Sequence, residues 1–202
     1  MSAPLVSNAD ARRLFLDRHH LSARRPGPAR PDGVARLIEE LGFVQVDSIR
    51  AVERAHHHIL HARLPAYRPR VLERLQKDAR VFEHWTHDAS LIPIAFYPYW
   101  QHVFAFYRAH TAKNAWWQKM LPEKKMIRQL LAEVEKRGPV TARDFAHMGE
   151  RKGAWWGWAP HKTALEYLWF TGELAIAARD GFEKIYDLSA RVIPPQHRSE
   201  KP

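Results

Sequence analysis

The apolar residues in the first half of the chain recur mainly at helical spacing. In the segment VARLIEEL, residues 34–41, they fall at positions i, i+3, i+4 and i+7, and Gly42 follows as a typical helix end. Residues 43–49 instead alternate apolar and polar side chains, which predicts an extended segment. Weaker patterns predict three further helices: one from an Asn8 or Asp10 cap to about residue 20, one over residues 70–76 and one over residues 97–107.

The second half of the chain shows a clearer order of helices. Residues 126–134 carry one apolar helical face, and Gly138 ends it. Thr141 and Asp144 have the spacing of a capping box, which predicts a second, short helix. Residues 160–171 form the third predicted helix.

Two strand-like runs follow the third helix, over residues 173–178 and 183–188. The Asp180-Gly181 pair between them is a strong hairpin signal. Three helices followed by a hairpin is the order of a winged helix, although any small α+β domain can share it. We therefore expect a mainly α fold with small β-hairpins, built from tandem winged-helix units. The expected units are an N-terminal winged-helix-like region over residues 1–112, a second winged helix over residues 122–193 with a hinge at 111–123 before it, and a tail over residues 194–202.

Composition narrows the class of protein. The 202 residues contain no cysteine, which excludes disulfides, zinc–thiolate sites and a thiol nucleophile. No apolar run approaches the roughly 18 residues needed to cross a bilayer, and no signal peptide is recognisable, so we expect a cytoplasmic protein without membrane contact. Lys and Arg outnumber Asp and Glu by 32 to 22, for a net charge of +10. Such a charge suits a polyanion such as DNA, although a basic surface alone does not prove that partner.

The predicted winged helix suggests particular DNA contacts. His161, Lys162 and Thr163 begin the third helix, which commonly enters the major groove in this fold. Arg179 and Lys184 flank the predicted hairpin tip. Winged helices also bind proteins, so the expectation that these cations contact DNA rests on the fold and the charge together. Cations and aromatic residues also mix in the preceding loop, where the tryptophans can serve either DNA or the core: Arg151, Lys152 and the segment Trp155-Trp156-Gly157-Trp158.

One pair of polar residues suggests chemistry. Gln45 and Asp47 are two positions apart, so an extended backbone presents both side chains on one side. A carboxylate can stabilise an oxocarbenium-like sugar while an amide orients the attacking water, which is what hydrolysis of a glycosidic bond requires. Most pairs of this kind are solvated strand edges or helix caps, so the pair alone is a weak signal.

Longer motifs around this pair resemble a known family. They are Gln45-Val46-Asp47-Ser48-Ile49, then Arg54-Ala55-His56-His57, and then the segment from Phe82 to Pro93, FEHWTHDASLIP. Together they resemble the winged-helix DNA glycosylases of the YcaQ/AlkZ type, in the branch whose catalytic motif is Gln-apolar-Asp, and the resemblance covers most of residues 8–193. It implies a bacterial repair enzyme that excises bulky N7-alkylguanines from duplex DNA and, in some members, unhooks interstrand crosslinks.

The resemblance also implies a mechanism. N7-alkylguanine carries a positive charge and leaves without strong acid assistance, so the enzyme needs mainly an anion near C1′ and an aligned water. Asp47 is expected to supply the anion and accept the proton of the water, and Gln45 to orient the water. No metal, other cofactor or lysine Schiff base is required, which predicts an abasic product without strand cleavage. Arg54 and His57 are further candidates for the DNA-facing cleft.

Two histidine-containing clusters have other interpretations. His56-His57-His58 with His61, and His84-His87-Asp88, offer spacings from which a metal can be bound. Neither has the HExxH arrangement, so contacts with DNA phosphates or packing are the favoured roles. Glu83 and Trp85 are expected to brace the structure.

Family chains continue past the second winged helix into further modules, whereas this chain ends near the close of a predicted wing. The sequence is therefore interpreted as a shortened version, whose fold is easier to predict than its activity. Two rival functions are a non-catalytic DNA-binding protein, such as a transcription regulator or a degenerate relative of the enzyme, and a protein-interaction module. A regulator predicts sequence preference, and an interaction module predicts little salt-dependent DNA affinity.

Overall fold

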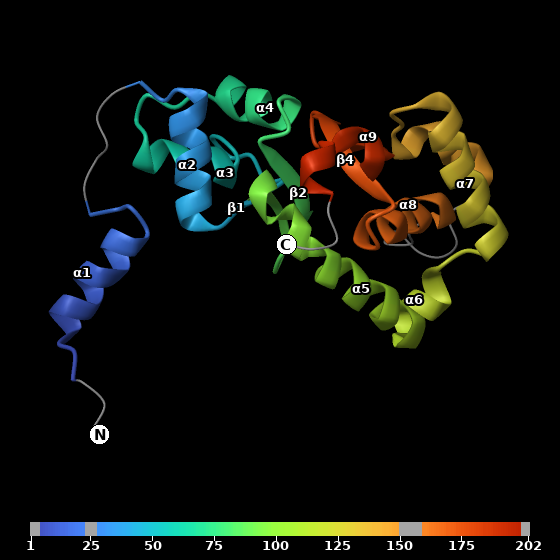
Figure 1. The fold of residues 1–202 in the computed structure, drawn as a ribbon, viewed down its shortest axis with the longest axis horizontal. Helices are drawn as coiled ribbons and strands as arrows, with labels where there is room; N and C mark the ends of the chain where they lie inside the picture. The colour runs from blue at the N-terminus through green and yellow to red at the C-terminus, as the bar shows by residue number, and fades with distance from the viewer. Residues whose placement is uncertain (1–4, 23–27, 150–158, 199–202) are drawn as a thin grey trace.

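The computed structural model describes residues 5–22, 28–149 and 159–198 as a mainly helical chain with small antiparallel sheets (Figure 1). The α-helices are α1 (Asn8–Arg18), α2 (Pro31–Leu41), α3 (Ala55–Arg63), α4 (Pro69–Lys77), α5 (Tyr97–Lys113), α6 (Ala115–Met120), α7 (Lys124–Arg137), α8 (Pro160–Phe170) and α9 (Ser189–Val192). The 3₁₀ helices are η1 (Ile94–Phe96), η2 (Ala142–Met148) and η3 (Pro195–His197). None of the helices in these ranges is long and apolar enough to cross a membrane.

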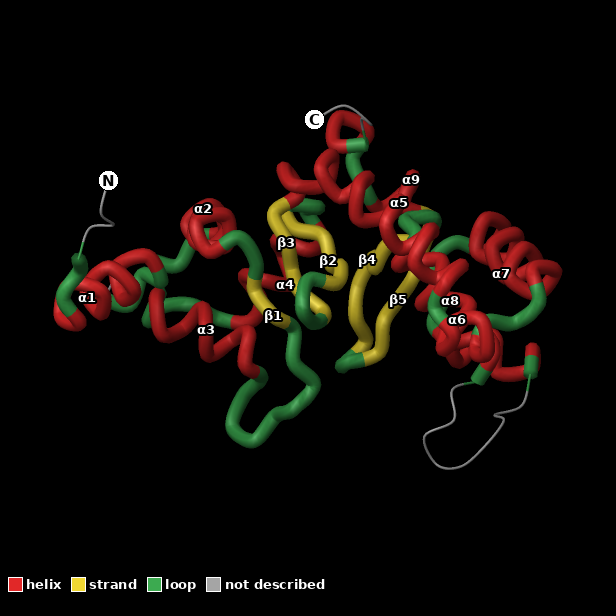
Figure 2. The backbone as a smooth tube through the Cα atoms, turned by 90° about the horizontal axis from the view of Figure 1, so that it is seen from below, coloured by secondary structure: helices red, strands yellow, loops and turns green. Residues whose placement is uncertain are grey.

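The first compact unit combines three helices with a three-stranded sheet. Strands β1 (Val44–Gln45), β3 (Ala89–Pro93) and β2 (Val81–Trp85) lie side by side in that order, with antiparallel pairing (Figure 2). Helices α2, α3 and α4 cover one face of this sheet. The apolar side chains between them form one core, which includes Leu37, Ile38, Val44, Leu60, Leu75 and Leu91.

The second compact unit repeats this order of elements. Helix α7 is followed by Val140, then η2, α8 and the hairpin of β4 (Leu174–Asp180) and β5 (Glu183–Leu188). Val140 forms an isolated β-bridge with Tyr186 on β5, just as β1 pairs with β3 in the first unit. Both units therefore run helix, extended segment, helix, helix and hairpin. Helices α5 and α6 connect them.

A buried polar contact joins the two units. The Arg179 guanidinium on β4 donates to both carboxylate oxygens of Glu83 on β2, at 2.8 and 2.6 Å, and the two side chains are 11% and 1% exposed. Trp169 on α8 donates from Nε1 to the Glu83 carbonyl oxygen at 3.1 Å. The Trp169 carbonyl oxygen in turn accepts from His84 Nε2 at 3.2 Å. The two units thus share a desolvated interface instead of being linked by chain alone.

Most helices agree with the sequence pattern. The helix that ends at Gly42 is confirmed, and Gly42 adopts a φ of +86°, which glycine accepts without strain. The cap of α1 is Ser7, whose side chain accepts from Asp10 N, so the prediction of Asn8 or Asp10 is wrong. The Thr141–Asp144 capping box is present, but it begins a 3₁₀ helix.

Three other features differ from the prediction. The hairpin of β2 and β3 was not predicted. Most of the segment expected to be a hinge, 111–123, is helical, since it contains the end of α5 and all of α6. In the β4–β5 hairpin, Asp180 pairs with Glu183, so the two turn residues are Gly181 and Phe182 instead of Asp180 and Gly181. Arg151, Lys152 and the Trp155–Trp158 segment lie outside the described residues.

Burial of His84 predicts a pH-dependent stability. Its ring is 2% exposed, and burial lowers its pKa from 6.5 to about 4. The unfolded chain binds this proton more readily, so the stabilisation is complete above pH 6.5 and is lost as the pH falls towards 4. In urea titrations we expect the wild type to lose on the order of 1–2 kcal/mol of unfolding free energy through His84 between pH 7.5 and pH 5.

The variant His84→Gln keeps a donor for the Trp169 carbonyl oxygen but does not titrate in this range. We expect a smaller loss of stability on acidification in this variant. His56, whose pKa burial also lowers to about 4, contributes a dependence of the same sign that remains. Equal pH dependence in wild type and His84→Gln would contradict the assignment.

Candidate functional site

Strand β1 and the extended residues directly after it carry Gln45 and Asp47 on one side of the backbone. Val44 and Val46, on the alternate positions, are 1% and 6% exposed and belong to the core of the first unit. Gln45 pairs with Ser90, and Val46 N donates to the Ala89 carbonyl oxygen at 2.7 Å, which extends the pairing beyond the strand. Because side chains alternate along an extended backbone, burial of the two valines turns Gln45 and Asp47 to the opposite face.

The turn between β2 and β3 fixes the Gln45 amide. Gln45 Nε2 donates to Asp88 Oδ2 at 3.3 Å, and Gln45 Oε1 lies 3.3 Å from His87 Nε2. A carboxylate only accepts, so the amide nitrogen must face Asp88, and the amide oxygen must accept from His87. Asp88 is itself held by the Ala89 amide, which donates to its Oδ1 at 2.8 Å. The orientation of Gln45 is therefore set from both ends.

Asp47 has one engaged and one available oxygen. Its Oδ1 accepts from Ile49 N at 2.8 Å, while Oδ2 has no hydrogen-bond partner among the residues with a described placement. Asp47 N donates to His56 Nδ1 at 3.4 Å, which requires that nitrogen to be unprotonated. Burial lowers the pKa of His56 to about 4, so the ring is neutral at physiological pH. Asp47 is half-buried, with a carboxylate oxygen free to meet a ligand.

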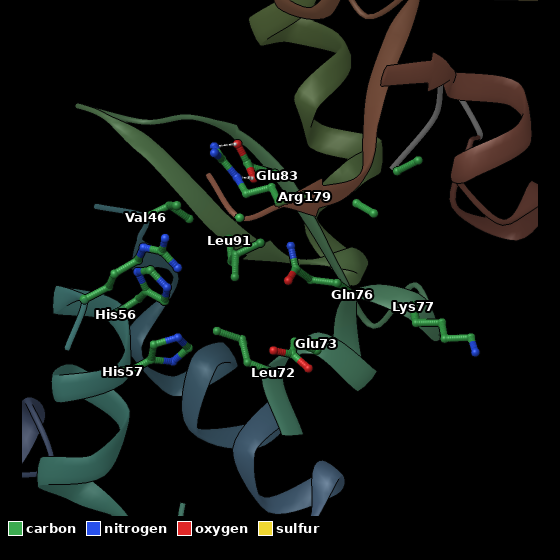
Figure 3. Close-up of a pocket in the computed structure, with 14 residues that line it drawn as sticks. Val46, His56, His57, Leu72, Glu73, Gln76, Lys77, Glu83, Leu91 and Arg179 are labelled. Atoms are coloured by element: carbon green, nitrogen blue, oxygen red, sulfur yellow. Dashed lines mark hydrogen bonds and ion pairs between the residues drawn. The ribbon is translucent and has the colours of Figure 1, made fainter. Parts of the chain in front are cut away.

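A cavity of about 510 Å³ lies between the first unit and the β4–β5 hairpin (Figure 3). His56 and His57 line one side of it, with Glu73 and Gln76 on the other. Gln45 and Asp47 are not among its lining residues, but Val46 and His56 are. The cavity therefore adjoins the Gln-x-Asp segment through Val46 and through His56, which accepts from Asp47 N.

The predicted DNA contacts divide into two groups. Arg54 lines the cavity and is half-buried, with its Nε inaccessible, and no carboxylate in the described part of the chain forms an ion pair with its guanidinium. Lys162 is exposed in the first turn of α8, whereas its neighbours His161 and Thr163 are 4% and 0% exposed. His57 is half-buried, its Nδ1 lies 2.8 Å from the Tyr67 hydroxyl, and burial lowers its pKa.

Arg179 and Lys184 are engaged within the fold. Arg179 forms the bidentate pair with Glu83, which also gives Glu83 the bracing role expected for it. Lys184 Nζ donates to both oxygens of Glu166 at 2.7 and 3.0 Å and lies 3.8 Å from the centre of the Trp169 ring. A DNA contact by either cation requires breaking a shielded ion pair, so the fold does not favour the role expected from their positions near the hairpin tip.

The side chains of the two histidine-containing clusters do not converge on one point. His84 points into an aromatic cluster that includes Trp100, Phe104 and Trp169, while His87 reaches Gln45 on the other side. His58 and His61 are exposed on α3. Within the described ranges, no three His, Asp or Glu side chains are placed to hold one metal ion.

Sequence patterns did not indicate the partners of Gln45. His87 and Asp88 were considered for metal or phosphate contacts. They lie 42 and 43 positions after Gln45 in the sequence, and only the pairing of the β2–β3 hairpin with β1 brings them into contact with it. The string Thr-His-Asp between two β-prone runs was the available signal for that turn.

Comparison with known proteins adds a family to this geometry. A family model described as "DNA glycosylase AlkZ-like" matches residues 38–202, a range that includes Gln45 and Asp47. Among solved structures, the DNA glycosylase AlkZ of Streptomyces sahachiroi is similar to the chain, with a TM-score of 0.58 and 17% sequence identity. The similarity covers 93% of this chain and 49% of that one, so the chain spans about half the length of that relative. At this identity the structural match shows a shared fold.

Proposed function

Because the chain belongs to the AlkZ-like DNA glycosylase family, we propose that it hydrolyses the N-glycosidic bond of N7-alkylated guanine in duplex DNA, including one arm of an interstrand crosslink. The observation that carries the proposal is the pair on β1. Gln45 is held by Asp88 and His87, and Asp47 keeps one oxygen free on the same face. The family match includes both residues. Together with Val46 they resemble the Gln-apolar-Asp catalytic motif of one branch of the family.

The proposed mechanism uses these two side chains and water. The alkylated guanine carries a positive charge, so its bond to C1′ breaks with the electron pair leaving on the base. The free oxygen of Asp47 stabilises the positive charge that develops on the sugar. Gln45 orients a water, Asp47 accepts its proton, and the water oxygen bonds to C1′. The products are the free base and an abasic site, and the mechanism needs no metal, other cofactor or amine nucleophile.

The fold supports duplex DNA as the partner. The order helix, extended segment, helix, helix and hairpin, which occurs twice, supports the proposal of tandem winged helices, which are related to the helix-turn-helix DNA-binding fold. The net charge of +10 favours a polyanion. We assign phosphate contacts to Arg54 and Lys162, whose cations are available. His57, which lines the cavity, is assigned a place beside the bound DNA. Arg179 and Lys184 are left to stabilise the fold.

Release of 7-methylguanine from methylated duplex DNA tests the proposal. We expect the protein to release the free base and to leave abasic sites that break only on alkali treatment. A duplex crosslinked by a nitrogen mustard, with each strand labelled, tests unhooking in the same way. Salt-sensitive duplex binding without any base release would instead support a DNA-binding protein that lacks the enzymatic activity.

The Asp88–Gln45 hydrogen bond gives a finer test of the mechanism. Replacing Asp88 with Ala frees the Gln45 amide, and we expect kcat for base release to fall roughly tenfold because the water loses its orientation. KM should change little, since Asp88 is not assigned a DNA contact. Asp88→Asn keeps only one acceptor oxygen for the two donors that Asp88 holds, Gln45 Nε2 and Ala89 N, so its kcat should fall between those of Asp88→Ala and wild type. A kcat for Asp88→Ala equal to that of wild type would remove Gln45 positioning from the mechanism.

A further inference from the structure

The loop between β1 and α3 projects from the body of the protein, directly after Asp47 (Figure 2). Its residues 48–52 are all exposed. Two of them are large and apolar: Ile49 is 74% exposed and Val52 is 84% exposed. Two exposed aliphatic side chains three positions apart on a projecting loop are available for contact with a partner.

The loop has a defined shape. Asp47 Oδ1 accepts from Ile49 N at 2.8 Å, which holds the backbone of Ile49 beside the carboxylate. Arg50 and Arg54 form a β-bridge, and Arg50 Nε lies 3.3 Å from Glu53 Oε1. The bridge closes a turn that contains Val52, and Ile49 lies immediately before that turn.

The second unit supports the base of this loop. Phe182, at the turn of the β4–β5 hairpin, lies with its ring centre 5.5 Å from the Arg54 guanidinium and 4.3 Å from that of Arg179. Arg179 is itself fixed by the buried Glu83. The base of the loop, at Arg54, is therefore in contact with the second unit, whereas Ile49 and Val52 remain exposed.

From this placement we propose that Ile49 and Val52 form an apolar wedge that enters the base stack beside the lesion and separates the alkylated guanine from its neighbour. The inference rests on the proposed function, for which duplex DNA is the substrate of Asp47. Aliphatic side chains inserted between base steps unstack and kink DNA, and both wedge residues are β-branched and therefore stiff, so little rotamer freedom is lost on insertion. The hydrogen bond from Ile49 to Asp47 couples the wedge to the carboxylate. Insertion next to the lesion thereby brings C1′ towards Asp47.

The experiment separates unstacking from hydrolysis. The probe is a duplex with 7-methyl-2′-fluoroarabinoguanine, whose 2′-fluorine suppresses bond cleavage, and fluorescent 2-aminopurine as the adjacent base. We expect wild type and Asp47→Asn to raise the fluorescence on binding. The double variant Ile49→Ser/Val52→Ser should bind the duplex but give little rise. The control, Val6→Ser/Leu14→Ser, removes two other exposed aliphatic side chains, 61% and 58% exposed, and should behave as wild type.

Excision assays complete the test. On duplex 7-methylguanine the wedge double variant should be slower than wild type by roughly tenfold or more. On the same lesion placed in an unpaired bubble, which is already unstacked, it should approach the wild-type rate. A fluorescence rise by the wedge double variant equal to wild type, or a wild type that excises the base without any rise, overturns the wedge. A rise that depends on the wedge in a protein that releases no base retains the wedge and rejects the hydrolysis.

Discussion

Asp47→Asn is expected to slow the release of 7-methylguanine on the order of a thousandfold or more, with duplex binding retained. The substitution keeps the shape of the side chain and an oxygen that can accept from Ile49 N. It removes the negative charge that stabilises the sugar cation and the base that accepts the proton of the water. Binding should be equal or slightly tighter, because one negative charge beside the DNA backbone is lost.

The measurement is single-turnover base release together with duplex affinity at two salt concentrations. Asp78→Asn is the matched control, since Asp78 lies at the end of α4 in an exposed pair with Arg74. The control changes the net charge equally and should retain wild-type excision. If Asp47→Asn excises as fast as this control, Asp47 is not the catalytic carboxylate. If both lose duplex binding, the loss reflects a folding defect and not catalysis.

Arg179→Met is expected to lower the free energy of unfolding by about 3–5 kcal/mol. The substitution leaves the Glu83 carboxylate, 1% exposed, without its bidentate partner in the interface between the units. An isolated charge in such a place is much less stable than a paired one. Urea denaturation at neutral pH, followed by tryptophan fluorescence, measures the effect.

The double variant Glu83→Leu/Arg179→Met identifies the cause. With both charges removed, most of the lost stability should return, because an apolar pair can replace a buried ion pair at little cost. Arg74→Met, which breaks the exposed Arg74–Asp78 pair, should change the stability by less than about 1 kcal/mol. A loss of that small size in Arg179→Met would mean that water reaches Glu83 readily. Equal losses in the single and double variants would point to packing instead of charge.

The helices and strands that could be predicted from the sequence are those with one buried and one exposed face. Helix α2 buries Val34, Leu37 and Ile38 and leaves its charged side chains in water, so its apolar spacing is plain. Strands β2 and β3 were not predicted because nearly every residue in them is buried, which leaves no alternation to detect.

The Gln45–Asp47 pair, proposed to be catalytic, was predictable because its geometry is local. Gln45 and Asp47 share a face through strand alternation and burial of Val46 alone. The ion pairs of Arg179 and Lys184 could not be predicted in this way. Each is a cation near a hairpin tip, and only the fold shows that a carboxylate 96 or 18 positions away already holds it.

The long sequence separation of Glu83 and Arg179 has a consequence for synthesis of the chain on the ribosome. Glu83 emerges 96 residues before its partner, an interval of about 5–20 s at ordinary elongation rates of ~5–20 residues per second. Throughout that time the nascent first unit carries an unpaired carboxylate on the sheet that will meet β4, and keeping it hydrated holds that sheet open. The interface between the two units therefore forms only when Arg179 arrives, and we expect nascent chains that stop short of Arg179 to be digested by protease more readily than those that include it.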